Sequence, residues 1–355
     1  MSSKNTFNCR DVMEGTDLIL KREQWVDIFK GLLIIFVVIS HSIPNEERGI
    51  SYYIFWFHMP AFFIIGGYLF KPLNNWAEYK SFAFNKAIKF LVPYFTFLFV
   101  ITFIHFMLTF QPSTILSDFI QVLYGGQKAI EYFGTFWFIT CYLSTMLLFA
   151  GILLIFKSAK LRFLVLLFFY ISAHIESWLA LTYKIQIPWN IDVSLLSVVY
   201  FSIGYSGRQI LHQINTKIFI SALLLSTISI AADYFNIITY ELNMKNLFYN
   251  NYVLDLVIPV LFLISLCGIC QHLPKYNTKI IGYIGEKSLV IMYLHIPIRI
   301  IMAHLTTYNN VVYIFIGTII PLLICKLFDY NEFTKMLFWG KIPKWINLAN
   351  NAQQN

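Results

Sequence analysis

The sequence is short of charged residues. Only 12% of its 355 residues are Asp, Glu, Lys or Arg, whereas a soluble domain usually carries about 25%. Hydrophobic residues make up 58%, against about 45–50% in soluble domains, and they form long blocks. The stretches at 49–70, 90–117 and 132–156 carry no formal charge, and each is long enough to cross a bilayer core of about 30 Å. The composition therefore excludes a soluble globular protein and predicts an all-α polytopic membrane protein.

We also expect neither a signal peptide nor interdomain linkers. The first 24 residues are polar and mixed in charge, and they contain neither an apolar core nor a small-residue cleavage site. No Pro- or Ser-rich tract, low-complexity stretch or convincing repeat divides the remainder. We expect a cytoplasmic N-terminal tail at 1–24, one membrane domain at 25–330 and a cytoplasmic C-terminal tail at 331–355.

Cysteine is scarce, with five residues scattered along the chain. Cys267 and Cys270 have the spacing of a redox or metal motif, but they lie in an apolar run without a second pair, which is more typical of packing. We therefore expect no disulfide and no metal site. The net charge of +8 does not indicate a nucleic-acid partner, because basic residues of a membrane protein mark its cytoplasmic loops. The expected partner is the lipid bilayer.

The apolar blocks predict about ten spanning segments. They cover residues 27–44, 50–70, 88–110, 133–156, 161–182, 192–207, 215–234, 252–271, 288–305 and 311–328. The sixth and seventh contain only about fifteen uncharged residues each, so a re-entrant helix remains an alternative for them. Lys and Arg gather in alternate loops, beginning with Lys21 and Arg22. By the positive-inside rule, this alternation predicts that both termini are cytoplasmic.

The first predicted segment, WVDIFKGLLIIFVVISHS, carries Asp27, Lys30 and His41. On a helix, Lys30 and His41 return to within about 20° of one face and lie roughly 16 Å apart along the axis. Asp27 precedes Lys30 by one turn and can pair with it. Because an ionisable group in mid-membrane costs roughly 2.5–3.5 kcal/mol, we expect this stripe to line a cavity. The alternative is that Asp27 and Lys30 reach the cytoplasmic interface and His41 caps the far end.

Further polar residues interrupt the other apolar segments. They are His58, Lys86, Lys89, Glu131, Ser288 and His295. Pro60 predicts a kink beside His58, and Gly66-Gly67 allows a close helix contact. Lys86 and Lys89 stand one turn apart at the expected cytoplasmic mouth of the third segment. They are either positive-inside anchors or contacts for phosphate groups.

Together these stretches resemble the acyltransferase-3 family of integral membrane acyltransferases, most closely its fucose 4-O-acetylase-like branch of polysaccharide O-acetyltransferases. Arg22, Asp27, Lys30, Gly31 and His41 are similar to the first-helix signature of that family. Four later stretches resemble further motifs of the family, in the same order: FHMPAFFIIGGYLF, KAIKFLVPY, GTFWFITCYL and IGEKSLVIMYLHIPI. The sequence departs where Gly66 replaces a more usual Ser, and where Lys86 and Lys89 replace Arg, because Lys cannot grip phosphate bidentately.

The resemblance implies transfer of an acyl group, usually acetyl, from acyl-CoA to a sugar hydroxyl of a surface glycan or its lipid-linked precursor, in a bacterial inner membrane. Acetyl-CoA is then a consumed co-substrate, and no permanently bound cofactor is expected. His41 becomes the essential histidine, and Lys30 the basic residue that orients the donor or steadies developing charge. The remaining catalytic candidates are Asp27, His58, Glu131 and His295, and the candidate donor contacts are Lys86, Lys89, Arg22 and Ser288.

The chemistry leaves two mechanisms and two other functions open. A thioester needs a deprotonated hydroxyl and a positive group near its oxyanion, so His41 is expected to be a general base; an acyl-histidine is the alternative. Coenzyme A is expected to dock inside, with its acyl arm reaching outward. A transporter could instead use Asp27, Lys30 and His41 as a proton path, although no inverted repeat supports this. A glycan polymerase or flippase typically has one large outer loop, which this sequence lacks.

Overall fold

The computed structural model describes residues 23–43, 46–249, 251–273, 277–306 and 309–343. Within these ranges the chain is helical and forms no strand, and nine helical segments are long and apolar enough to cross a membrane. Their bounds are α2 (Gln24–Ser42), α3 and α4 (Ile50–Phe55 and His58–Tyr68, one segment), α5 (Trp76–Thr109), α7 (Phe136–Ile155), α8 (Ala159–Tyr183), α11 (Thr216–Tyr234), α12 (Leu254–His272), α14 (Ser288–Leu305) and α15 (Asn310–Phe328). The all-α, polytopic architecture is therefore confirmed.

The sixth predicted segment differs from the others. It forms α9 (Ser194–Ser206), a helix of 13 residues, which spans only about 20 Å. Helices α4, α7 and α8 pack around α9, and most of its residues are buried. A helix enclosed by protein need not match the bilayer thickness, because its ends are satisfied by neighbouring segments. The seventh segment, in contrast, forms a helix of spanning length, α11.

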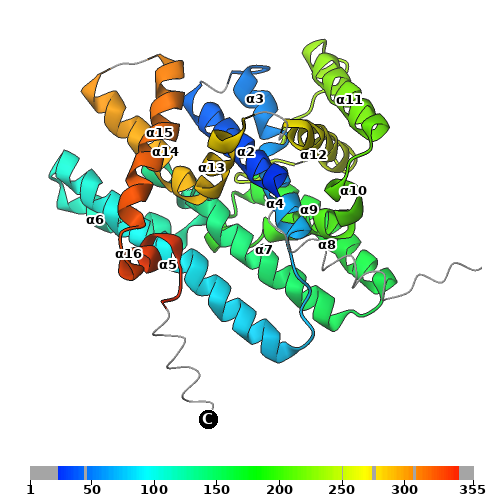
Figure 1. Cartoon of the computed structure of the whole chain (residues 1–355), viewed down its shortest axis with the longest axis horizontal. Helices are drawn as coiled ribbons and strands as arrows, with labels where there is room; N and C mark the ends of the chain where they lie inside the picture. Colours follow the sequence, from blue (N-terminus) through cyan, green and yellow to red (C-terminus); the bar gives the residue numbers. More distant parts are fainter. Residues whose placement is uncertain (1–22, 44–45, 250, 274–276, 307–308, 344–355) are drawn as a thin grey trace, which may run out of the picture.

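Helix α2 lies at the centre of the molecule (Figure 1) and contacts α3, α4, α12, α14, α15 and the short α13 (Lys279–Glu286). Its contact with α13 is the most intimate, because Gly31 and Gly285 let the two backbones touch. A Cβ on Gly31 would overlap the Ile281 carbonyl, and one on Gly285 would overlap that of Asp27. This packing covers the first turns of α2.

The second segment is broken beside its proline. Helix α3 ends at Phe55 and α4 begins at His58, so that Pro60 lies in the first turn of α4, where its missing N–H costs little. The adjacent glycine pair makes the predicted close contact, since a Cβ on Gly67 would overlap the backbone of α9. His58, the first residue of α4, is buried.

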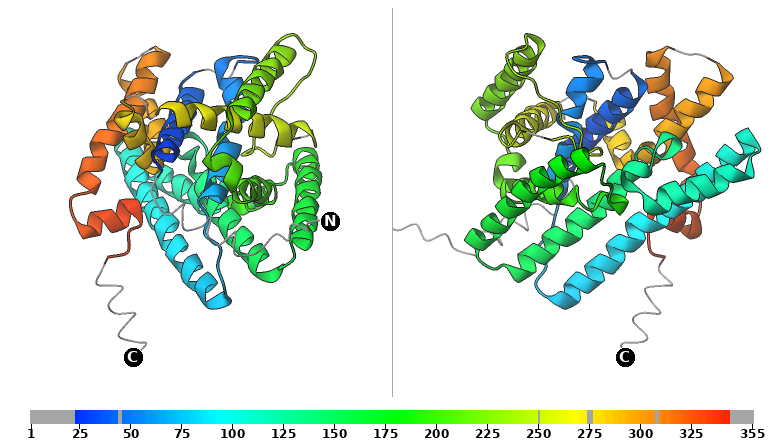
Figure 2. Two further views of the ribbon diagram at one scale, coloured as in Figure 1. Left: turned by 45° about the vertical axis from the view of Figure 1, so that its right-hand side comes forward. Right: turned by 180° about the vertical axis from the view of Figure 1, so that it is seen from behind.

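Helix α5 is longer than its apolar part. It begins at Trp76, where the side chain of Asn75 accepts a hydrogen bond from the Glu78 amide at 2.9 Å, and its 34 residues extend about 51 Å. Lys86 and Lys89 therefore lie inside α5 and not at its end. Figure 2 shows α5 and α7 side by side. The remaining helices are α6 (Pro112–Tyr124), α10 (Arg208–His212), α16 (Glu332–Trp339), η1 (Gly126–Lys128), η2 (Glu131–Phe133) and η3 (Pro188–Asn190).

Candidate active site

A cavity of about 500 Å³ opens at the His41 end of α2, and we call it the His41 cavity. Its walls come from α2, α3, α4, η2, α7, α14 and the segment between α11 and α12. Its charged or polar lining residues are His41, His58, Glu131, Thr135, Asn243, Lys245, Asn246 and Arg299. Apolar and aromatic side chains, among them Phe55, Trp137 and Phe138, make up most of the rest. Three residues predicted from the sequence, His41, His58 and Glu131, thus share one cavity.

The imidazoles of this region are held in defined orientations. His58 Nδ1 lies 2.7 Å from the Ile54 carbonyl oxygen, and His295 Nδ1 lies 2.8 Å from that of Ile291. Because a carbonyl only accepts, both Nδ1 atoms carry a proton, and Nε2 is the basic atom of each neutral ring. His295 does not line the His41 cavity but lies behind it, with its ring centroid 5.3 Å from that of His41.

Two cations in this cavity were not predicted. Arg299 donates a hydrogen bond from Nη1 to the His41 carbonyl and so ties α14 to the last turn of α2. Its sequence signal was present, because a charge one turn after His295 in an apolar segment carries the same cost that singled out Lys30. Lys245 lies in a polar loop, where one more lysine carries no such signal. Both cations line the same cavity as His41.

A second cavity of about 590 Å³ lies at the Lys30 end of α2, and we call it the Lys30 cavity. Its polar and charged lining residues are Lys30, Asn85, Lys89, Tyr142, Glu286, Ser288 and Lys341. Lys30 Nζ also pairs with Asp27 Oδ1 at 2.8 Å. The turn after α16 forms one wall, since a Cβ on Gly340 would overlap the backbone of Lys89. The lysine content makes this cavity suitable for an anionic ligand.

The two cavities adjoin inside the protein. Phe138 of α7 and Met292 of α14 line both of them. Thr135 fixes the two helices at this point by donating a hydrogen bond of 2.7 Å to the Met292 carbonyl. The polar stripe of α2 was expected to line one cavity; instead it contributes Lys30 to one and His41 to the other.

The other predicted residues fall in several places. Ser288 and Lys89 line the Lys30 cavity, whereas Lys86 stacks over the Phe82 ring at 5.3 Å and is absent from that lining. Asp27 is buried beneath α13 and lines neither cavity. Arg22 lies outside the described residues. The geometry thus separates Lys89 from Lys86, which the sequence treated as equivalent.

Comparison with known proteins gives one family. Residues 23–330 match the acyltransferase-3 family model, which is described as an acyltransferase domain. No curated protein and no solved structure matches the chain.

Proposed function

This chain belongs to the acyltransferase-3 family, and on that premise we propose that it moves an acetyl group from acetyl-CoA to a sugar hydroxyl. One observation carries the proposal. Helix α2 contributes Lys30 to one cavity and His41 to another, and Phe138 and Met292 line both. A donor bound in the first cavity could therefore present its thioester in the second.

The Lys30 cavity is the proposed donor site. The ammonium groups of Lys30, Lys89 and Lys341 line it together with a single carboxylate, Glu286, so its charge suits the phosphates of coenzyme A. By the positive-inside rule this end of α2 faces the cytoplasm, where acyl-CoA is made. The pantetheine arm would pass between Phe138 and Met292 toward the His41 cavity.

The His41 cavity is the proposed acceptor site. Its volume of about 500 Å³ is in the range of small-molecule sites, and Trp137 offers a ring face on which a sugar can pack. His41 would take the proton of the acceptor hydroxyl as general base. The oxygen would then attack the thioester carbonyl, and the leaving thiolate would recover the proton. An acyl-histidine on His41 is the alternative route for the same residues.

The proposed acceptor class follows the fucose 4-O-acetylase-like branch: a sugar of a surface polysaccharide or of its lipid-linked precursor, in a bacterial inner membrane. The transporter alternative, with a proton path along Asp27, Lys30 and His41, is not favoured by the family. The aromatic wall and the lysine-rich donor cavity support transfer to a glycan from a phosphorylated carrier.

The test uses purified protein in liposomes. Acetyl-CoA and methyl α-L-fucoside or other methyl glycosides are supplied, and the release of free thiol is followed together with the mass of the glycoside. We expect thiol release and an added acetyl group in equal amounts. Movement of a solute without thiol release would identify a carrier and refute the proposal.

A further inference from the structure

Hydrogen bonds hold Lys245 at both its side-chain ammonium and its backbone carbonyl. Its ammonium donates hydrogen bonds to the carbonyl oxygens of Ala129 at 2.6 Å and Gly134 at 3.0 Å. Its own carbonyl accepts a hydrogen bond of 2.9 Å from Asn190 Nδ2. Three segments far apart in the sequence therefore converge on one lysine that lines the His41 cavity.

The backbone around Lys245 is a closed turn. Asn243 and Phe248 form an antiparallel bridge, with N···O distances of 2.9 and 3.0 Å, and Lys245 lies in the four-residue tip. A tip closed in this way needs little further ordering when a ligand binds. The lysine side chain is thus already placed before substrate arrives.

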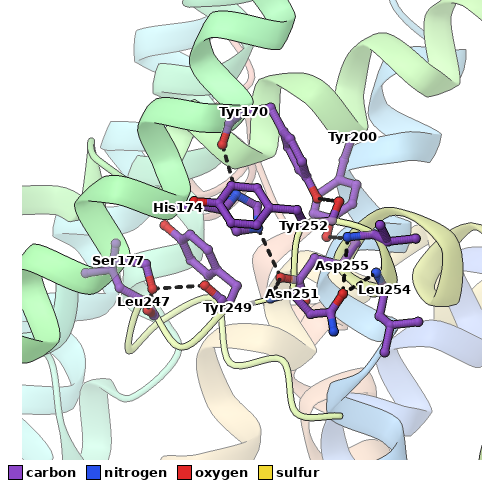
Figure 3. A network of polar contacts seen from close by, with 11 residues as sticks. Tyr170, His174, Ser177, Tyr200, Leu247, Tyr249, Asn251, Tyr252, Leu254 and Asp255 are labelled. Carbon is purple, nitrogen blue, oxygen red and sulfur yellow. Dashed lines mark hydrogen bonds and ion pairs between the residues drawn. The ribbon is translucent and has the colours of Figure 1, made fainter. Parts of the chain in front are cut away.

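A buried polar network anchors the base of this turn (Figure 3). Ser177 of α8 donates a hydrogen bond of 3.0 Å to the Tyr249 carbonyl. Asp255 accepts from the Asn251 amide at 2.9 Å and from His174 Nε2 at 3.1 Å. The loop that carries Lys245 is therefore attached to α8 and α12 and cannot drift from the cavity without breaking buried hydrogen bonds.

Among the described residues the ammonium of Lys245 contacts no counter-charge, and Glu131 supplies the one carboxylate in the lining of its cavity. The two acceptors of the ammonium are neutral carbonyls. An ammonium has three N–H groups, so one remains for a group inside the cavity. Most of the lining is apolar, and in such surroundings a fixed cation attracts a negative charge more strongly than it would in water.

We propose that Lys245 is a catalytic residue that donates its third N–H to the oxyanion formed on the acyl carbonyl during transfer. This inference rests on the proposed function. As the acceptor oxygen bonds to the thioester carbon, its proton passes to His41 and the carbonyl oxygen becomes negative. The C–S bond then breaks, the carbonyl re-forms and the thiolate takes the proton from His41. Lys245 keeps its protons throughout and acts only as a donor.

The alternative is that Lys245 has only a structural role, holding the turn against residues 129–134. The experiment distinguishes this structural role from donation to the oxyanion. Initial rates of Lys245→Met and of the control Lys128→Met are measured in liposomes with acetyl-CoA and methyl α-L-fucoside. Lys128 is exposed on the neighbouring η1, over the Tyr124 ring at 4.1 Å, and is not part of the cavity lining. The control therefore removes the same charge from the same part of the molecule.

Loss of one oxyanion donor lowers kcat by about 10²–10³-fold. We expect that loss in Lys245→Met, with both KM values within about twofold of the wild type and Lys128→Met unchanged. Lys245→Cys should behave like Lys245→Met and recover when 2-bromoethylamine rebuilds an amine on the thiol, with treated wild type as reference.

Three results would overturn the inference. They are unchanged kcat and KM values, a raised glycoside KM at unchanged kcat, and a lowered melting temperature with activity that the amine does not restore. The second would show that Lys245 contributes to ground-state binding of the glycoside, and the third that its role is structural. Absence of transfer by the wild type itself would instead refute the proposed function.

Discussion

The contact between α13 and α2 offers a sharp test of how the Lys30 cavity, the proposed donor site, is built. In Gly285→Ala the added Cβ would overlap the Asp27 carbonyl oxygen and stand 2.8 Å from the Gly31 nitrogen. Ordinary contacts begin near 3.4 Å, so α13 must retreat by at least about 0.6 Å at that nitrogen, and further at the carbonyl. Both neighbours are helix backbone, which cannot rotate away as a side chain could.

The cost of this displacement can be bounded. Overpacking a well-packed contact costs about 1–3 kcal/mol, and the rigid neighbours place Gly285→Ala at the upper end. At about 2 °C for each kcal/mol in a large domain, the melting temperature should fall by about 6 °C. Because α13 leads into Glu286 and Ser288, which line the Lys30 cavity, kcat/KM for acetyl-CoA should also fall, by about 10- to 100-fold.

Gly151→Ala in α7 is the matched control. A Cβ at Gly151 meets nothing within 4 Å, so this variant should keep its activity and gain up to about 1 kcal/mol from better helix propensity. The assay combines melting of the detergent-solubilised protein with initial rates over a range of acetyl-CoA concentrations. If Gly285→Ala had the same melting temperature and the same kcat/KM for acetyl-CoA as Gly151→Ala, the reasoning about how α13 and α2 form the Lys30 cavity would be refuted.

Three further predictions follow from individual contacts. Lys89→Met should raise the KM for acetyl-CoA by about 10- to 100-fold, which corresponds to the loss of one hydrogen bond to a charged group. Lys86 lies outside the lining of the Lys30 cavity, so Lys86→Met should raise this KM less. Equal KM values for the two variants, measured from initial rates over a range of acetyl-CoA concentrations, would contradict this. His174→Ala should lower stability by about 1–3 kcal/mol, because the buried Asp255 carboxyl group loses its hydrogen bond from α8 and keeps only the one from the Asn251 amide. An unchanged melting temperature would contradict this prediction. Burial lowers the pKa of Lys245 to about 8, so kcat should fall as the pH rises through 8 and the ammonium becomes neutral. Lys245→Arg, whose guanidinium stays charged, should not show this fall in the pH–rate profile. The same fall in both proteins would assign it to another group.

The sequence was sufficient for the membrane helices, because an apolar run of spanning length has few other uses. It was less informative at α9, for which a re-entrant helix had been kept as an alternative, and at the start of α5. Hydropathy detects contact with lipid, whereas α9 is enclosed by protein and the first turns of α5 are polar. Helix caps such as Asn75 mark an element boundary that hydropathy does not detect.

The residues that line the two cavities were predictable where an ionisable side chain interrupts an apolar helix, because such a side chain is energetically costly in a membrane. Lys30 and His41 stood out because they interrupt an apolar helix, and Arg299 could have been found by the same argument. Lys245 could not. It lies in a polar loop, and its contacts with residues 129 and 134 join segments more than 110 positions apart. The division of the polar stripe between two cavities also depended on how α7 and α14 pack.

The central claim is that this family member acetylates a glycan through His41. The most direct measurement compares the wild type with His41→Ala in cells that lack other glycan acetylases, at equal membrane levels, by mass spectrometry of the surface glycans. We predict an acetyl increment with the wild type and none with His41→Ala. An increment that survives in His41→Ala would contradict the assignment of His41 as the catalytic base.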